Sequence, residues 1–271
     1  MPNITPSFIT ANYVARAVDY RGPSEWAPHD EATLAAASPE RFLEIVRDVV
    51  GCGFESVDVW TAHCHFARHD REDYLEQVKG FCSQFDLTIG SYAGGFEAKT
   101  PADVDRVFRF MKQLGAPLFA GGIRGLAPGE LCPMVNDACH RFGVRWGFEN
   151  HPADHSVNDI VAAIDGGRHD RVGVALDTGW AATNGFDPVD AAKRLIDMGR
   201  LFIVHLKDVK AAGAHDTCTI GDGVADCERV VRTLVDAGWS GTLTIEHEPF
   251  DHDPTDEIRT SLERVKGWLK G

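Results

Sequence analysis

Residues 172–179 read VGVALDTG, an apolar and β-branched run that ends in an acid and a glycine. Continuous apolar runs of this length are typical of parallel strands that are buried on both faces. Three other runs share this form: RWGFEN at 145–150, LFIVHLKDV at 201–209 and TLTIEHE at 242–248. The polar residues near their ends are Glu149, Asp177, His205 and Glu246, spaced by 28, 28 and 41 residues. Because each spacing fits at least one strand-plus-helix unit, we expect all four side chains at one rim of one sheet.

The same pattern recurs upstream and gives eight strand-like runs in all: 7–13, 54–60, 87–95, 117–123, 145–150, 172–179, 201–209 and 242–248. Segments with helical periodicity alternate with them: 39–50, 70–85, 101–114, 126–142, 156–165, 188–198, 225–237 and 254–270. Eight alternating units predict an α/β protein whose parallel sheet closes into a (β/α)8 TIM barrel. The competing doubly wound sheet usually carries a G-x-G-x-x-G turn after its first strand, and the segment ITANYVARA has none.

Length and charge narrow the organisation and the partners. The 271 residues are expected to form a single domain, 1–271, since barrels of this kind run to roughly 250 residues. The formal net charge of −14 excludes nucleic acids and anionic membranes as natural partners. Seven cysteines without a C-x-x-C pair indicate a reducing compartment. The opening MPNITPSFIT does not resemble a signal peptide, so we expect a cytoplasmic protein.

The segment 14–38 between the first strand and the first helix is unusually long. Connections of this length tend to be lids or binding loops, and Trp26 within it could face a ligand. The alternative is an ordered surface loop whose aromatic residues pack locally.

The four strand-end residues predict a metal site. Two glutamates, an aspartate and one imidazole are mainly hard oxygen donors, which suits Mn²⁺, with Mg²⁺ or Co²⁺ as alternatives, better than a thiolate-preferring ion. Each residue alone could be a helix cap, an ion-pair partner or a core histidine. Three carboxylates crowded at one rim, however, repel one another unless a cation compensates them.

The motifs GFENHP, ALDTG, HLKDV, IGDG and GWSGTLTIEHEP resemble those of the sugar phosphate isomerase/epimerase family of xylose-isomerase-like TIM barrels. The resemblance implies that Glu149, Asp177, His205 and Glu246 bind one divalent metal, usually manganese. It also implies that Glu149 and Glu246 exchange protons with a sugar. A metal that holds a sugar carbonyl stabilises the enediolate formed when the neighbouring carbon loses its proton.

Two positions depart from the family's epimerase pattern. The histidine of D-x-x-H is replaced by Trp180, and the arginine of H-x5-R is replaced by Ala211. These changes weaken the case for ordinary ketose epimerisation and remove the expected phosphate grip. Lys207 could bind substrate, or it could pair with Asp208 or another carboxylate.

Aromatic and imidazole side chains are expected around the rim instead. Trp26, Trp60 and Trp180 are candidate substrate-binding residues for a flat, partly apolar group. His63, His65 and His151 are candidate acid–base residues, although His63 or His65 could instead cap the following helix.

The segment TANYVAR at 10–16, with these aromatic residues, resembles the α subunits of bacterial C-glycoside deglycosidases. That branch implies a lyase that removes the C2 proton of a 3-oxo-C-glycoside and cleaves its carbon–carbon bond by elimination, together with a small β subunit. His151 would be the leading base, with His63 or His65 assisting at the aglycone.

Three other functions compete with this one. The first is an isomerase or epimerase of a non-phosphorylated ketose or aldose, which returns the proton. The second is a phosphodiesterase of the endonuclease IV type, which the acidic charge disfavours. The third is a non-catalytic sugar-binding barrel, against which the four intact strand-end residues argue.

Overall fold

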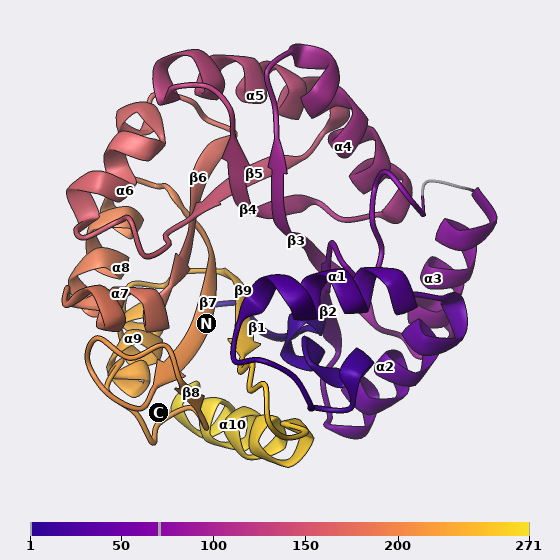
Figure 1. Ribbon diagram of the computed structural model, residues 1–271. Helices are drawn as coiled ribbons and strands as arrows, with labels where there is room; N and C mark the ends of the chain where they lie inside the picture. Colours follow the sequence, from indigo (N-terminus) through magenta and orange to yellow (C-terminus); the bar gives the residue numbers. More distant parts are fainter. Residues whose placement is uncertain (1, 70–71, 271) are drawn as a thin grey trace.

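Eight parallel strands pair side to side until the last meets the first, in the computed structural model, which describes residues 2–69 and 72–270 (Figure 1). The strands are β1 (Ile4–Ile9), β2 (Ser56–Trp60), β3 (Thr88–Glu97), β4 (Leu118–Arg124), β5 (Arg145–Glu149), β6 (Val172–Asp177), β7 (Leu201–Val209) and β9 (Gly241–Glu246). Strand β1 pairs with both β2 and β9, and β9 pairs with β7, which closes the barrel. The predicted single-domain (β/α)8 barrel is therefore confirmed.

A ring of helices surrounds the barrel (Figure 1). Its members are α2 (Pro39–Gly51), α3 (Glu72–Gln84), α4 (Pro101–Leu114), α5 (Pro128–Phe142), α6 (Val157–Ala163), α8 (Pro188–Asp197), α9 (Cys227–Asp236) and α10 (Thr255–Trp268). Each overlaps a predicted helix, although the predicted start of the second one, at residues 70–71, lies outside the described residues. Two short helices, η3 (Asp165–Gly167) and α7 (Thr178–Asn184), were not predicted.

The first strand lies further upstream than the predicted 7–13. Strand β1 pairs with β9 from Ile4 onward, and a 3-10 helix η1 (Thr10–Tyr13) follows it directly. The chain turns there because the side-chain amide of Asn12 donates to the carbonyl of Ile245 (3.1 Å) and accepts from the N–H of His247 (2.8 Å). Asn12 thus ties the start of the chain to the end of β9.

The long segment 14–38 is largely ordered into secondary structure. It forms a 3-10 helix η2 (Arg16–Val18) and then the helix α1 (Trp26–Ala36), which lies across one face of the barrel (Figure 1). The short strand β8 (Thr217–Cys218), which pairs antiparallel with the end of β7, was also not predicted.

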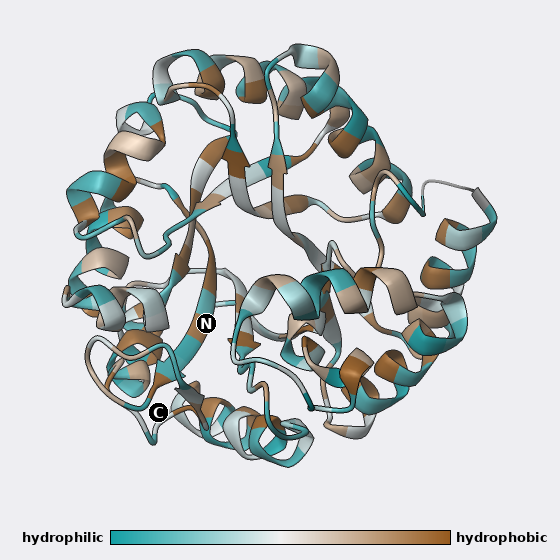
Figure 2. Cartoon of the chain, in the orientation of Figure 1, coloured by the Kyte–Doolittle hydropathy of each residue, from teal (hydrophilic) through white to brown (hydrophobic). Residues whose placement is uncertain are grey.

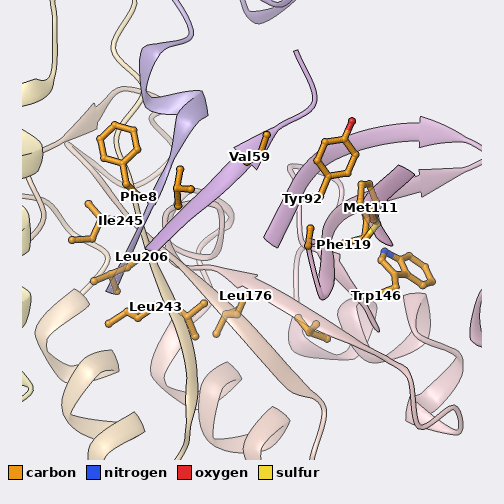
Figure 3. Close-up of a cluster of buried hydrophobic side chains, with 14 of the residues drawn as sticks. Phe8, Val59, Tyr92, Met111, Phe119, Trp146, Leu176, Leu206, Leu243 and Ile245 are labelled. Atoms are coloured by element: carbon orange, nitrogen blue, oxygen red, sulfur yellow. The ribbon is translucent and has the colours of Figure 1, made fainter. Parts of the chain in front are cut away.

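Apolar side chains fill the space between the barrel and the helices. Figure 3 shows members of this layer: Phe8, Val59, Tyr92, Phe119, Trp146, Leu176, Leu206, Leu243 and Ile245. The strands and the inward helix faces are mostly hydrophobic, and polar residues gather on the outside (Figure 2). Because all eight strands run in parallel, their carboxyl ends meet at one rim, where loops can carry function. None of the described helices combines the length and the apolar character needed to cross a bilayer.

Candidate functional site

Three strand-end residues meet at the carboxyl rim. Nδ1 of His205 on β7 lies 2.8 Å from Oε1 of Glu149 on β5 and 3.0 Å from Oε2 of Glu246 on β9. One donor atom from each lies within 4.8 Å of those of the other two, and all three side chains are buried. Within the described residues, Nε2 of His205 has no hydrogen-bond partner. Oε2 of Glu246, which faces Nδ1 of His205, is also buried without a hydrogen-bond partner among these residues. Such an oxygen is costly to bury, and a metal ion held by this group would satisfy it.

Asp177 lies beside this group and makes different contacts. It ends β6 and caps α7, since its Oδ1 accepts the N–H of Trp180 at 2.8 Å. Its Oδ2 is buried without a hydrogen-bond partner in the described part of the chain, and it lies 3.4 Å from Nζ of Lys207. Three of the four predicted ligands are therefore brought together, and the fourth faces Lys207.

Lys207 supplies the positive charge among these acids. Its Nζ lies 2.5 Å from Oε1 of Glu246 and 2.8 Å from Oε2 of Glu248, and the side chain is buried. Gly179 makes room for the lysine, because a Cβ at this position would lie 2.6 Å from Cγ of Lys207. Lys207 was expected to bind substrate or to pair with Asp208 or another carboxylate. In the structure it pairs with Glu246 and Glu248.

Asp208 has a separate structural role. Its carboxylate accepts the backbone N–H groups of Gly221, Gly223 and Ala225 at 2.9–3.0 Å. These bonds hold the loop that contains the IGDG motif against the end of β7. The expected alternative of a Lys207–Asp208 pair is therefore not realised.

The pKa values at the rim follow from burial and crowding. Burial raises the pKa of Asp177 to about 6; Lys207 opposes this rise, and Glu246 and Glu149 add to it. Burial would lower the pKa of His205, but the two glutamates raise it well above its usual value. Burial also raises the pKa of Glu248 well above its usual value. Without another cation, the negative charge of the rim carboxylates is therefore balanced by bound protons and by the ammonium group of Lys207.

A cavity of about 1050 Å³ opens above this group. Its wall on the β5–β9 side includes Glu149, His205, Lys207, Glu246 and Glu248. His151 also lines it and is half-exposed. Its Nδ1 lies 2.9 Å from the backbone carbonyl of Glu149, two residues earlier, and its Nε2 lies 3.8 Å from Oε2 of Glu149. The structure therefore places the predicted His151 beside the carboxylate of Glu149.

The three predicted tryptophans all line the cavity. Trp26 from α1 meets Trp60 from the end of β2 edge to face, with ring centroids 5.3 Å apart. Trp180 lies on the opposite side, with its ring 5.4 Å from Nζ of Lys207 and 6.3 Å from the ring of His151. The replacement of a histidine by Trp180 thus puts an aromatic face beside the acidic rim.

The two histidines after β2 differ in position. His65 lines the cavity, and burial, with help from His69, Arg68 and Arg106, lowers its pKa to about 4. His63 lies apart from the large cavity. It borders a separate cavity of about 60 Å³, and its Nδ1 lies 3.1 Å from Oγ1 of Thr10. Its side chain is buried and is not among the residues that line the large cavity.

Glu248 and Arg124 are two charged cavity residues that the sequence did not single out. Glu248 could have been found by alternation, since Glu246 and Glu248 lie two positions apart in an extended segment and face the same side. Arg124 ends β4 and lines the cavity, with an exposed side chain. It follows the second of two AGG triplets, at 93–95 and 120–122, which pair in register across β3 and β4.

The chain belongs to the xylose isomerase-like TIM barrel family, whose model matches residues 46–270. No curated protein matches the chain significantly. Among solved structures, a D-allulose 3-epimerase from Methylomonas sp. has a TM-score of 0.72 at 13% identity, covering 99% of each chain. A D-psicose 3-epimerase from Clostridium cellulolyticum H10 has a TM-score of 0.68 at 11% identity, covering 98% of this chain and 99% of that one.

A third similar structure is the probable 3-DHS dehydratase AsbF, involved in petrobactin synthesis, from Bacillus anthracis. Its TM-score is 0.68 at 14% identity, covering 97% of this chain and 98% of that one. At these identities, the three likenesses establish the fold.

Proposed function

We propose that this chain is a divalent-metal-dependent isomerase or epimerase that moves a proton next to the carbonyl of a non-phosphorylated sugar. The observation that carries the proposal is the buried group of Glu149, His205 and Glu246 under a cavity large enough for a sugar. Family membership and two 3-epimerases of the same fold support this class.

The donor set fits a hard divalent ion, with Mn²⁺ first and Mg²⁺ or Co²⁺ as alternatives. Glu149, His205 and Glu246 would hold it, and Asp177 would be the fourth ligand through its buried Oδ2. When bound, such an ion acts as a Lewis acid that stabilises negative charge on the sugar oxygens.

The chain's own residues would carry the proton. Glu149 and Glu246 flank His205 from different strands, so each carboxylate can face the substrate from its own side. One takes the proton from the carbon next to the carbonyl, and the other returns a proton to the opposite face. His151, 3.8 Å from Glu149, would exchange protons with it through one bridging water, and Lys207 keeps Glu246 ionised.

The cavity chemistry supports a substrate without a phosphate. Lys207 is already paired with acids, and the position of the missing arginine holds Ala211. Arg124 remains at the mouth, where it would bind the far end of the substrate. His65, which also lines the cavity, would hydrogen-bond a substrate hydroxyl.

Helix α1 would act as the lid. Trp26, Ala27, Asp30 and Leu34 from this helix line the cavity, and Trp26 is 40% exposed. A bound sugar would cover Trp26 and hold the helix over the reacting atoms, which excludes water from the enediolate.

A second candidate is cleavage of a 3-oxo-C-glycoside by elimination, with a small β subunit as partner. The observation that favours it is the size of the cavity, about 1050 Å³, together with its Trp26–Trp60 pair. This volume lies at the upper end of the ~300–1,000 Å³ of small-molecule sites and leaves room for an aryl group beside a sugar ring. The first step, loss of a proton next to the carbonyl, is the same.

The test is incubation of the manganese-loaded protein in D₂O with D-tagatose, D-allulose and a 3-oxo-C-glucoside, followed by NMR. Deuterium at the carbon beside the carbonyl, with an interconverted sugar, supports the isomerase or epimerase. Release of the free aglycone supports the elimination instead. Neither product, from a protein that retains manganese, argues against both. Glu149→Gln should lose the exchange, whereas Glu130→Gln, an exposed acid on α5, should keep it.

A further inference from the structure

A second group of potential ligands lies outside the cavity, around His247. Glu246 and Glu248 on either side of this histidine both line the cavity, whereas His247 does not. Its imidazole is instead buried against Glu257 in the first turn of α10, with Nε2 2.9 Å from Oε2 of the carboxylate. Successive side chains of an extended segment point to opposite sides, so His247 points away from the proposed active site.

His252 reaches the same carboxylate oxygen from the loop between β9 and α10. Its Nε2 lies 2.7 Å from Oε2 of Glu257, so two imidazole nitrogens and one carboxylate oxygen converge. These three donor atoms all lie within 4.8 Å of one another. Such a distance range allows one ion to contact all three.

The second nitrogen of each imidazole is also held. Nδ1 of His247 lies 2.8 Å from Oγ1 of Thr217 on β8, and Nδ1 of His252 lies 2.6 Å from Oδ1 of Asp251. Metal-binding histidines are usually oriented in this way, through a hydrogen bond from the nitrogen that does not face the metal. The two rings are therefore fixed with both Nε2 atoms toward Glu257.

We propose that His247, His252 and Glu257 form a second metal site, for a zinc-class divalent ion. Two imidazoles and one carboxylate form a three-ligand set that zinc commonly takes, with a fourth position left for water or another ligand. Glu257 and His252 are 38% and 46% exposed, so an ion can reach the group from solvent. This set contains two nitrogen ligands, more than the strand-end group. The strand-end group, with mainly oxygen ligands, favours manganese or magnesium instead.

The site would connect three parts of the fold. His247 follows the last barrel strand, Glu257 lies in the first turn of the last helix, and Thr217 belongs to β8. An ion there would clamp the segment that carries Glu246 and Glu248 against α10. We therefore expect zinc to stabilise the folded protein without taking part in proton transfer.

The test is the zinc content of the full chain after chelator treatment, loading with ZnCl₂ and desalting. In the Glu149→Gln background, which weakens the strand-end site, one zinc should remain. The added change His252→Ala should remove it, or weaken its binding at least tenfold. His140→Ala is the matched control, since His140 is also an exposed histidine paired with an acid, Asp170 at 2.9 Å. Zinc binding that His252→Ala leaves unchanged would overturn the proposal, as would no binding in the Glu149→Gln protein.

Cobalt gives an independent signal. Co²⁺ in a four-coordinate, nitrogen-containing site absorbs strongly in the visible range, and this band should be present in Glu149→Gln and absent in His252→Ala/Glu149→Gln. Because His252 lies outside the cavity lining, His252→Ala alone should retain manganese-dependent deuterium exchange at the sugar. Failure of the second site and failure of the proposed enzyme function are thus distinguishable.

Discussion

Nζ of Lys207 lies 2.5 Å from Oε1 of Glu246, and both side chains are buried. The same ammonium contacts Glu248 and faces Asp177, so one lysine serves three acids at the rim. A divalent ion would add positive charge to a group that Lys207 alone only partly balances.

Replacing Lys207 by methionine should therefore destabilise the metal-free protein by about 3–5 kcal/mol, because it leaves buried carboxylates without their partner. Urea unfolding in the presence of a chelator measures the change. Lys207→Met/Glu248→Gln should recover part of the loss, since it removes one of the stranded charges. A Lys207→Met protein as stable as the original would show that the ion pairs do not compensate the acids.

Manganese should stabilise the protein through the strand-end group. At a free manganese concentration 100 times the Kd, the free energy of unfolding should rise by about 2.7 kcal/mol. Thermal or urea unfolding with and without a chelator measures this gain. Asp177→Asn and Glu149→Gln should each reduce it, whereas Asp190→Asn, an exposed acid on α8, should not. An equal gain in all variants would place the ion elsewhere.

The sequence predicted the strand-end residues because buried parallel strands leave a strong apolar pattern and their ends must share a rim. It did not predict the end of β1, because what ends this strand is the long-range contact of Asn12 with Ile245 and His247. Helix α1 was missed for a related reason. It contains Pro28 and buries only His29 and Thr33, so it lacks the apolar stripe of a packed helix.

The site shows the same division between pattern and tertiary contact. The sequence pattern predicted the residues at strand ends and singled out Lys207. It could not predict which acids pair with Lys207, because these acids lie on strands far apart in the sequence. His63 and His65 could not be separated by sequence, since the 3.1 Å contact of His63 with Thr10 decides which ring is buried.

Two neighbouring glycines on β4 should respond differently to alanine. Gly121 has φ of +147°, and a Cβ there would lie 1.8 Å from the carbonyl oxygen of Gly94 on β3. Gly121→Ala should therefore cost about 3–5 kcal/mol of folding free energy, measured by urea unfolding. A Cβ at Gly122 meets nothing within 4 Å, so Gly122→Ala should change stability by less than about 1 kcal/mol. Equal effects would contradict the close approach of β3 and β4.

His63 should make the protein sensitive to acid. Burial, with a smaller contribution from Arg16, lowers its pKa to about 3, below the ordinary value of 6.5. The unfolded chain therefore binds a proton that the folded protein does not, and stability is lost as pH falls below 6.5 toward 3. Between pH 7 and pH 5, the loss from this group is about 2 kcal/mol.

His63→Asn keeps a polar atom near the position of Nδ1 but does not titrate in this range. Its free energy of unfolding should therefore fall by about 2 kcal/mol less than that of the original protein between pH 7 and pH 5. Chemical denaturation at the two pH values measures this difference. Parallel pH profiles would show that His63 is accessible to protons in the folded state.

Arg124 should determine how tightly the far end of the substrate binds. Its guanidinium lies over a glycine of β3, since a Cβ on Gly95 would be 3.5 Å from Nη1 of Arg124, and both residues line the cavity. Because Arg124 ends β4, whereas the acids proposed to transfer protons lie on β5 and β9, it should contact substrate without entering the chemistry. Arg124→Gln should thus raise KM about tenfold and leave kcat nearly unchanged, the pattern of a lost binding contact that is equal in ground and transition states.

Steady-state kinetics on the sugar identified by deuterium exchange makes the comparison, with Arg109→Gln on the exposed face of α4 as control. A fall in kcat at constant KM would instead give Arg124 a role in stabilising the enediolate.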